Sequence, residues 1–287
     1  MPEEPSENIS GGPGGGGRDV VFEAARADGA TRAEVVVDRL GDLYWRKAYG
    51  GQGGFECLVR TILSQNTSDK ASQPAHDELM ARYGDSADLR STDDSSETPP
   101  REHDLAESLA AADRDELVDA IRSAGLYNQK SSLIIGVAEE VLADFGSETD
   151  FDRYVREADP SEVRDRLLEM KGVGPKTADC VLLFAGGRGG VFPVDTHVHR
   201  ISRRIGLAPA DADHEDVRTH LERDVPAEKC GFGHTAMIQF GREYCTARTP
   251  TCLDGTDECP MADVCERVGI SQETGDVVDP ADSIVDS

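Results

Sequence analysis

The stretch LLEMKGVGPKTADCVLLFA, residues 167–185, decides how this chain is expected to fold. Ser161 can cap a helix that leads into this stretch, because its hydroxyl can accept a hydrogen bond from the first helical turn. Gly172 and Gly174 permit a tight hairpin after that helix, since glycine tolerates backbone conformations that other residues avoid. Pro175 suits the first turn of a second helix. The pattern therefore predicts a helix–hairpin–helix.

The predicted hairpin suits a phosphate group. Backbone N–H groups are exposed in a tight turn and at the start of a helix, where they hold an anion without reading base sequence. Lys171, Gly172 and Gly174 are therefore candidate DNA-binding residues. A glycine turn that merely joins two packed helices would produce the same pattern, so the hairpin alone leaves both interpretations open.

The segment VDTHVHRISRRIGL, residues 194–207, places Asp195 nineteen residues after Lys176. Asp195 followed by Thr196 is typical of a helix N-cap. A capping carboxylate keeps a fixed direction and stays ionised, so it can stabilise positive charge that develops on a sugar. Capping and catalysis are compatible at this position.

Four of the seven cysteines lie in the segment CTARTPTCLDGTDECPMADVC, residues 245–265. An odd total with such crowding predicts a ligand cluster and argues against a disulfide framework. Four thiolates suit either a cubane iron–sulfur cluster or a tetrahedral zinc ion, and spacing alone does not decide between them. The candidate ligands are Cys245, Cys252, Cys259 and Cys265. The remaining cysteines are expected to be small buried apolar residues; they are Cys57, Cys180 and Cys230.

Apolar residues recur with helical spacing along the chain, and no run alternates as a strand would. We therefore expect an all-α protein. Residues 1–27 and 270–287 are expected to be disordered tails, and residues 85–103 an acidic surface insertion. Besides the helix–hairpin–helix at residues 161–185, helices are predicted at residues 31–47, 55–63, from 69 onward, 104–124 and 128–144.

The net charge of −26 and the pI near 4.5 argue against a nucleic-acid binder, because phosphate contact depends on Lys and Arg. The charge is unevenly distributed, however. Residues 84–116 hold eleven acidic and three basic side chains, whereas residues 164–204 hold four acidic and eight basic ones. Six lysines against twenty-four arginines, with abundant carboxylates, are expected in a salt-rich cytoplasm and a halophilic source, although a GC-rich genome would also favour arginine.

Together these motifs resemble the endonuclease III branch of the helix–hairpin–helix DNA glycosylase superfamily, over residues 31–268. In that family a GVG-x-K hairpin followed by VDTH supplies a catalytic lysine and aspartate, which match Lys176 and Asp195 here. GLYNQK, residues 125–130, and LSQNTSD, residues 63–69, also match segments of the family.

The resemblance implies two helical lobes with a DNA cleft between them. A six-helix barrel would cover residues 51–192, and an iron–sulfur lobe would combine residues 28–50 with residues 193–269. The four clustered cysteines would bind a 4Fe–4S cluster, with Arg248 at a phosphate. The family's cysteine spacing is six, two and five intervening residues, whereas this chain has six, six and five. The longer acidic loop LDGTDE, between Cys252 and Cys259, can still place Cys259 at the same ligand position of a cluster.

The implied activity is base excision: removal of an oxidised pyrimidine from double-stranded DNA, followed by β-elimination at the abasic site through a lysine Schiff base. The damaged base must first leave the duplex. Gln65 and Asn66 are candidates for filling the vacated space, or they only cap the next helix. The amine of Lys176 must be neutral to attack the sugar C1′.

Three alternatives stay open from sequence. They are another glycosylase of the superfamily, directed at mismatches or alkylated purines, a non-catalytic DNA-binding module with a zinc or iron–sulfur site, and an electron carrier. Lys176 argues against relatives that act on adenine mismatches, since those lack the hairpin lysine. An electron carrier would leave the hairpin and VDTH unexplained. No apolar run is long enough to span a membrane, so we expect a cytoplasmic, nucleoid-associated monomer.

Overall fold

The computed structural model describes residues 30–44, 53–67, 69–84, 104–255 and 258–284. The chain divides into two compact units, residues 52–188 and residues 1–51 with 189–287. In the described ranges the regular elements are helices, and β-type pairing is limited to one isolated bridge between Ile270 and Val277. The all-α prediction is confirmed.

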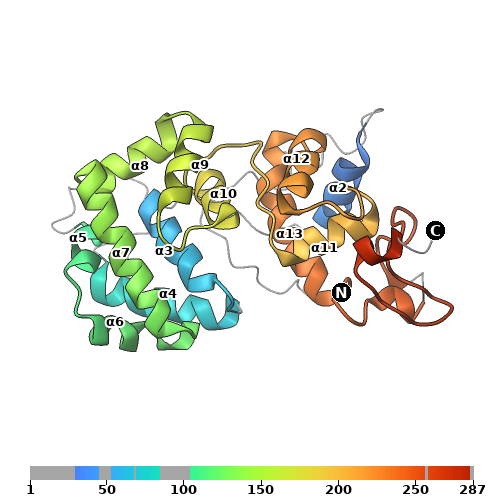
Figure 1. Cartoon of the computed structure of the whole chain (residues 1–287), viewed down its shortest axis with the longest axis horizontal. Helices are drawn as coiled ribbons and strands as arrows, with labels where there is room; N and C mark the ends of the chain where they lie inside the picture. The colour runs from blue at the N-terminus through green and yellow to red at the C-terminus, as the bar shows by residue number, and fades with distance from the viewer. Residues whose placement is uncertain (1–29, 45–52, 68, 85–103, 256–257, 285–287) are drawn as a thin grey trace. The chain divides into compact units, whose positions relative to one another are not determined.

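The unit of residues 52–188 is built around helix α3 (Gly54–Ser64), which contacts α4, α7, α8 and α10 (Figure 1). Phe55, Leu58 and Ile62 recur three and four residues apart on α3 and are fully buried, as expected of the apolar face of a helix. The other helices of this unit are α4 (Asp69–Tyr83), α5 (Leu105–Ala110), α6 (Arg114–Ala120), the 3-10 helix η1 (Arg122–Ala124), α7 (Tyr127–Phe145), α8 (Glu148–Glu157), α9 (Pro160–Glu169) and α10 (Pro175–Phe184).

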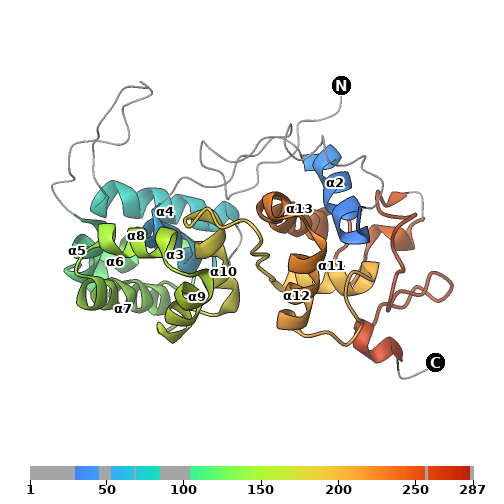
Figure 2. The ribbon, with the colours of Figure 1, turned by 90° about the horizontal axis from the view of Figure 1, so that it is seen from above.

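The second unit combines distant parts of the sequence. Helix α2 (Arg32–Tyr44) lies beside α13 (Cys230–Glu243), as Figure 2 shows, and also contacts α12 (His214–Asp224). Val36, Val37 and Leu40 of α2 are fully buried there. The remaining helices described in this unit are α11 (Thr196–Ile205) and the 3-10 helices η2 (Ala227–Lys229), η3 (Thr251–Leu253) and η5 (Pro280–Ile284).

A buried ion-pair network ties α2 to the start of α13. Lys229 is fully buried, and its Nζ lies 2.7 Å from Glu34 Oε1 and 2.7 Å from Asp38 Oδ1. Burial opposes the charged lysine, but the two carboxylates outweigh this effect and raise the pKa of Lys229.

Replacing this lysine should destabilise the fold strongly. We expect Lys229→Met to lower the free energy of unfolding by about 3–5 kcal/mol, because it leaves two carboxylates in a buried site without their cation. Chemical denaturation of the full chain measures this change. Adding Glu34→Gln and Asp38→Asn should recover most of the loss. A loss below about 1 kcal/mol, the range of exposed pairs, would contradict the network's importance.

Two predicted helix boundaries were wrong. The helix expected over residues 104–124 is divided into α5, α6 and η1, because Asp113 caps a new helix by accepting hydrogen bonds from the N–H groups of Asp115 and Glu116. Helix α9 is capped by Asp159, with Pro160 at its first position, and the expected cap Ser161 instead donates its own N–H to Asp159. Asp159, two residues before Ser161, accepts hydrogen bonds from the N–H groups of Ser161 and Glu162 and so caps the helix in its place.

The acidic C-terminal segment also differs from the expected disordered tail over residues 270–287, because the structure describes it up to residue 284. The guanidinium of Arg203, largely buried, holds Asp279 with two N–O distances of 2.8 and 2.9 Å. Val278 N–H donates to Gly269 O at 2.9 Å. Paired hydrogen bonds of this kind anchor a segment whose composition alone favours disorder.

The expected tail over residues 1–27 and the expected insertion over residues 85–103 lie outside the described residues. Among the helices that the structure does describe, none combines the length and the apolar character needed to cross a bilayer.

Candidate functional site

The predicted hairpin joins α9 to α10. Gly172 has a φ of 83°, a conformation that favours glycine, and Val173 N–H donates to Met170 O at 3.1 Å to close the turn. The two helices are joined by a buried ion pair, in which Arg164 Nε donates to Asp179 Oδ1 at 2.7 Å. The hairpin is thus held rigidly by both its turn and its helices.

Lys176 lies in the first turn of α10 and is half-buried. Pro175 begins this helix, as predicted, and the N-cap Gly174 provides no side-chain cap. Lys171 and Gly172 are exposed on the turn just before it. The positive end of a helix therefore adjoins Lys176, with two exposed hairpin residues beside it in the chain.

The turn that follows α3 contacts the hairpin directly. Gln65 Nε2 donates to Gly172 O at 3.1 Å and to Thr177 Oγ1 at 3.2 Å. Asn66 is exposed and has a φ of 52°, which is uncommon for a residue other than glycine. Gln65 and Asn66 thus form a tight turn against the hairpin. This contact could not be predicted from the sequence, because the two segments lie far apart in the chain.

Leu126 is a candidate that sequence reasoning missed. The residue is 52% exposed, and its φ of 48° places it in a strained turn before α7. Thr67 Oγ1 donates to Ala124 O, so this turn is attached to the one that carries Gln65. The GLYNQK segment was the available signal, but periodicity alone could not reveal that Leu126 is exposed on a turn bonded to the one that carries Gln65.

Asp195 is the N-cap of α11, as predicted. Its Oδ1 accepts hydrogen bonds from the N–H groups of His197 and Val198, both at 2.8 Å. The side chain is half-buried. Asp195 belongs to the unit of residues 189–287 and Lys176 to that of residues 52–188, so each is fixed by contacts within its own unit.

Helix α11 is also bonded to the cysteine segment. Arg200 Nη2 donates to Cys245 O at 2.9 Å and lies 3.2 Å from His197 Nδ1. One turn later, Arg204 donates to Thr246 O at 2.6 Å and to Cys245 Sγ at 3.6 Å. The helix that begins at Asp195 is therefore a direct support of the cysteine segment, which sequence reasoning did not foresee.

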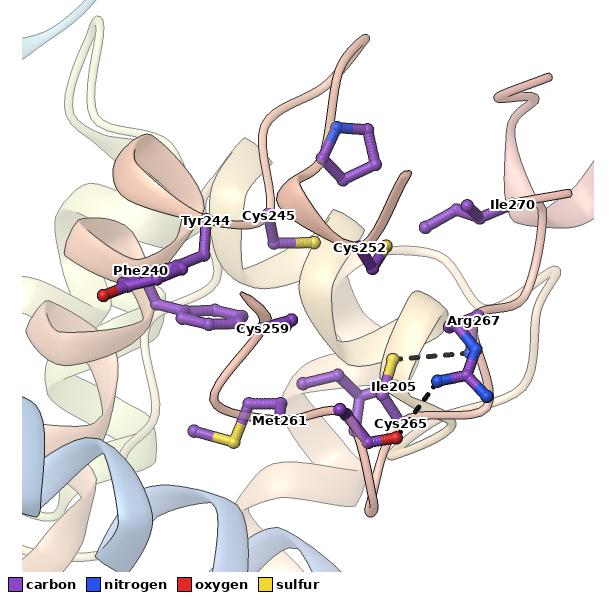
Figure 3. A pocket seen from close by; sticks show the side chains of 12 residues that line it. Ile205, Phe240, Tyr244, Cys245, Cys252, Cys259, Met261, Cys265, Arg267 and Ile270 are labelled. Carbon is purple, nitrogen blue, oxygen red and sulfur yellow. Dashed lines mark hydrogen bonds between the residues drawn. The ribbon is translucent and has the colours of Figure 1, made fainter. Parts of the chain in front are cut away.

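The four clustered cysteines line one pocket (Figure 3). Phe240, Met261 and Ile270 supply apolar walls. Arg267 N–H donates to Cys265 Sγ at 3.3 Å. Burial raises the pKa of Cys265 to about 11, and the other cysteines of the segment add to this effect. The residues that line the pocket are Ile205, Phe240, Tyr244, Cys245, Pro250, Cys252, Cys259, Met261, Ala262, Cys265, Arg267 and Ile270.

The donor set of this pocket suits a thiolate-bound iron–sulfur cluster. Four sulfurs surround an apolar space, and N–H donors from Arg204 and Arg267 reach two of them. Within the ranges that the structure describes, no group of three or more His, Cys, Asp or Glu side chains is arranged so that it could hold a metal ion. The chemistry of the residues fits a metal site, while their present arrangement does not form one.

The remaining predicted residues fall as follows. Arg248 lies in the cysteine segment and is exposed. The other cysteines are buried, as expected of small apolar residues: Cys57, Cys180 and Cys230. The C-terminal segment reaches the same region, because Gln272 Nε2 donates to Cys252 O at 2.8 Å.

Comparisons with known proteins agree with these observations. Residues 59–227 match the model of the HhH-GPD superfamily base excision DNA repair proteins. The chain is 35% identical to the endonuclease III of Bacillus subtilis over 236 residues, which cover 82% of this chain and 91% of that one. It is 32% identical to the endonuclease III of Sulfolobus acidocaldarius over 212 residues, covering 74% and 81%.

A solved structure is similar over most of its length. A trapped covalent intermediate of endonuclease III with DNA matches with a TM-score of 0.62 and 25% identity, covering 83% of this chain and 96% of that chain. The family model spans more than half of the present chain, and the Bacillus relative exceeds 30% identity over most of both chains. The chain therefore belongs to the HhH-GPD superfamily of base excision DNA repair proteins, within its endonuclease III family.

Proposed function

We propose that this chain is a bifunctional DNA glycosylase and abasic-site lyase that removes oxidised pyrimidines from double-stranded DNA. The observation that carries the proposal is the position of Lys176, half-buried in the first turn of α10 and directly after the hairpin. An amine fixed at this position can act as a nucleophile. The hairpin beside it can hold the DNA backbone.

Phosphate binding falls to the hairpin and its surroundings. The exposed backbone of Lys171 and Gly172, with Gly174 at the uncapped start of α10, offers N–H donors and the positive end of a helix. We propose Arg248, which is exposed, as a further phosphate contact. Such contacts position the duplex without selecting its sequence.

Base extrusion requires groups that replace the extruded nucleotide. Gln65 and Asn66 provide polar side chains on a tight turn, which can bond the orphaned opposite base. Insertion of Gln65 would exchange its two bonds to the hairpin for bonds to DNA. Leu126 provides an exposed apolar side chain that can wedge between stacked bases.

Catalysis would begin when the neutral amine of Lys176 attacks the sugar C1′. The bond from C1′ to the base breaks, and the base leaves with a proton. The resulting iminium acidifies the C2′ proton. Its removal is followed by cleavage of the C3′–O bond, and the 3′ phosphate departs. The product is a nicked strand, with the sugar fragment attached to Lys176 until water releases it.

Asp195 would stabilise the positive charge that builds on the sugar as the base leaves. Its carboxylate is held by two backbone N–H groups, so its direction is set before the substrate arrives. A fixed charge of this kind acts without reorganising during the reaction.

We further propose that Cys245, Cys252, Cys259 and Cys265 bind a 4Fe–4S cluster. When bound, the cluster would crosslink the cysteine segment and lend it rigidity. Arg204 and Arg267 would donate to two of its sulfur ligands, as they do to the thiols here. Tetrahedral zinc is the competing occupant.

Replacing one of the four cysteines tests whether it is a ligand of the cluster or an ordinary buried cysteine. We expect Cys252→Ala to lose bound iron and the visible charge-transfer absorbance of the purified protein, because a cluster needs all its thiolates. The matched control is Cys230→Ala, which alters a buried cysteine outside the segment. It should keep both signals. Zinc with no visible absorbance in the wild-type chain would contradict the cluster proposal.

The activity is tested with a duplex that carries a single thymine glycol. The purified full chain should release the modified base and cut the strand on the 3′ side of the lesion. Base release without cleavage would contradict the lyase and indicate a monofunctional glycosylase. Binding without either reaction would indicate a non-catalytic DNA-binding module.

A further inference from the structure

Lys130 is a buried lysine whose hydrogen bonds connect three segments of one unit. It lies in the first turn of α7, and only 2% of its surface is exposed. Its Nζ donates to Leu63 O at 2.7 Å, to Thr67 Oγ1 at 2.6 Å and to Ala124 O at 2.9 Å. An ammonium has three N–H donors, so these acceptors match its full capacity.

The acceptors lie at helix ends that need a donor. Ile62 O accepts the N–H of Gln65 at the end of α3, whereas the neighbouring carbonyl of Leu63 accepts from Lys130. Ala124 ends η1, and its carbonyl accepts from both Lys130 and Thr67. A cation placed at the carbonyl ends of two helices is favoured by their dipoles.

The same bonds hold together two strained turns. One turn carries Gln65 and Asn66, and the other carries Leu126. Asn66 and Leu126 both adopt positive φ values, 52° and 48°, which residues with side chains adopt only when their surroundings enforce them. Lys130 contacts both turns and thereby links their positions.

Burying the charged amine of Lys130 costs free energy, and a contribution to stability does not explain why a lysine stands at this position. In the described ranges, the acceptors recorded for Lys130 are all uncharged. Burial lowers its pKa to about 8. A buried cation without a carboxylate is weak evidence for a stabilising role, because apolar residues commonly fill such a volume at less cost. Its distinctive contribution is the geometry of the two turns.

We propose that Lys130 is a positioning residue that holds the Gln65–Asn66 turn and the Leu126 turn as one rigid surface for entering the DNA duplex. The inference rests on the proposed function of these turns in base extrusion. It implies that Lys130 is needed where a base must leave a duplex, and is dispensable for the amine chemistry of Lys176.

Two substrates distinguish the extrusion of a base from a duplex from the amine chemistry of Lys176. One is a duplex with a single thymine glycol, and the other is a single-stranded oligonucleotide with an abasic site, which has no stacked base to extrude. We expect Lys130→Met to slow single-turnover base release from the duplex by about tenfold to a hundredfold, as small misplacements do. Cleavage of the single-stranded abasic substrate should stay near the wild-type rate.

The hydroxyl of Thr67 supplies a second variant in case Lys130→Met fails to fold. Thr67→Val keeps the shape but removes the hydroxyl that accepts from Lys130 and donates to Ala124 O, while the direct bond from Lys130 to Ala124 O remains. It should therefore show the same selective loss to a smaller extent. Thr67→Ser keeps the hydroxyl and should restore the wild-type rate on the duplex. Lys229→Met is the control for destabilisation, and it should not discriminate between the substrates.

Equal losses on the two substrates, or no loss on the duplex, would overturn the positioning role. Failure of the proposed function gives a different result, because the wild-type chain would then cleave neither substrate. That result would remove the basis of this inference as well.

Discussion

Lys176→Ala is expected to slow strand cleavage at an abasic site by at least about a thousandfold, because the variant lacks the amine that attacks the sugar. The side chain lies in the first turn of α10 and is half-buried, outside the apolar core, so its loss should leave the fold intact. Single-turnover cleavage of a duplex with one abasic site measures the effect, with thermal unfolding to verify folding.

Lys171→Ala is the matched control for this variant. Lys171 is an exposed lysine on the same hairpin, five residues earlier in the chain. It should weaken DNA binding, chiefly at low salt, while cleavage at saturating enzyme stays near wild type. If Lys176→Ala still cut the strand at the wild-type rate, another group would have to be the nucleophile.

Asp195→Asn is expected to slow base release by about a hundredfold to a thousandfold, because it removes the charge that faces the developing cation. Asparagine caps helices about as well as aspartate, so both hydrogen bonds to the start of α11 can persist. The substitution therefore separates the electrostatic role of Asp195 from its capping role.

Single-turnover base release and thermal unfolding together test this separation. Asp195→Asn should unfold near the wild-type temperature, whereas Asp195→Ala should also lose about 1 kcal/mol of stability with the cap. A wild-type rate of base release for Asp195→Asn would contradict the electrostatic role and leave Asp195 with a capping role alone.

Local signals predicted much of the fold. The glycines and proline of residues 172–175 predicted the hairpin and the start of α10, and Asp195 before Thr196 predicted the cap of α11. Each depends on a few neighbouring residues whose conformational preferences act within one turn. The misplaced cap at Ser161 shows the limit, since Asp159 competes for the same N–H groups.

Contacts between distant residues could not be predicted. Gln65 bonds to a hairpin 107 residues away, and Arg203 anchors a segment 76 residues later. No local pattern encodes such pairs, because they arise from packing of whole helices. The acidic C-terminal segment is low in apolar residues, so its sequence predicts disorder, whereas Arg203 and Gly269 anchor it in the structure. The salt-rich origin inferred from the charge composition stays a prediction.

Lys176 should form a covalent bond with the sugar of the damaged nucleotide. The direct test is borohydride reduction of the full chain mixed with a thymine glycol duplex, followed by mapping of the modified peptide by mass spectrometry. We predict one protein–DNA adduct, located at Lys176 and absent from Lys176→Ala. The absence of any adduct from a folded, cluster-loaded chain, or an adduct at another residue, would show that Lys176 is not the nucleophile.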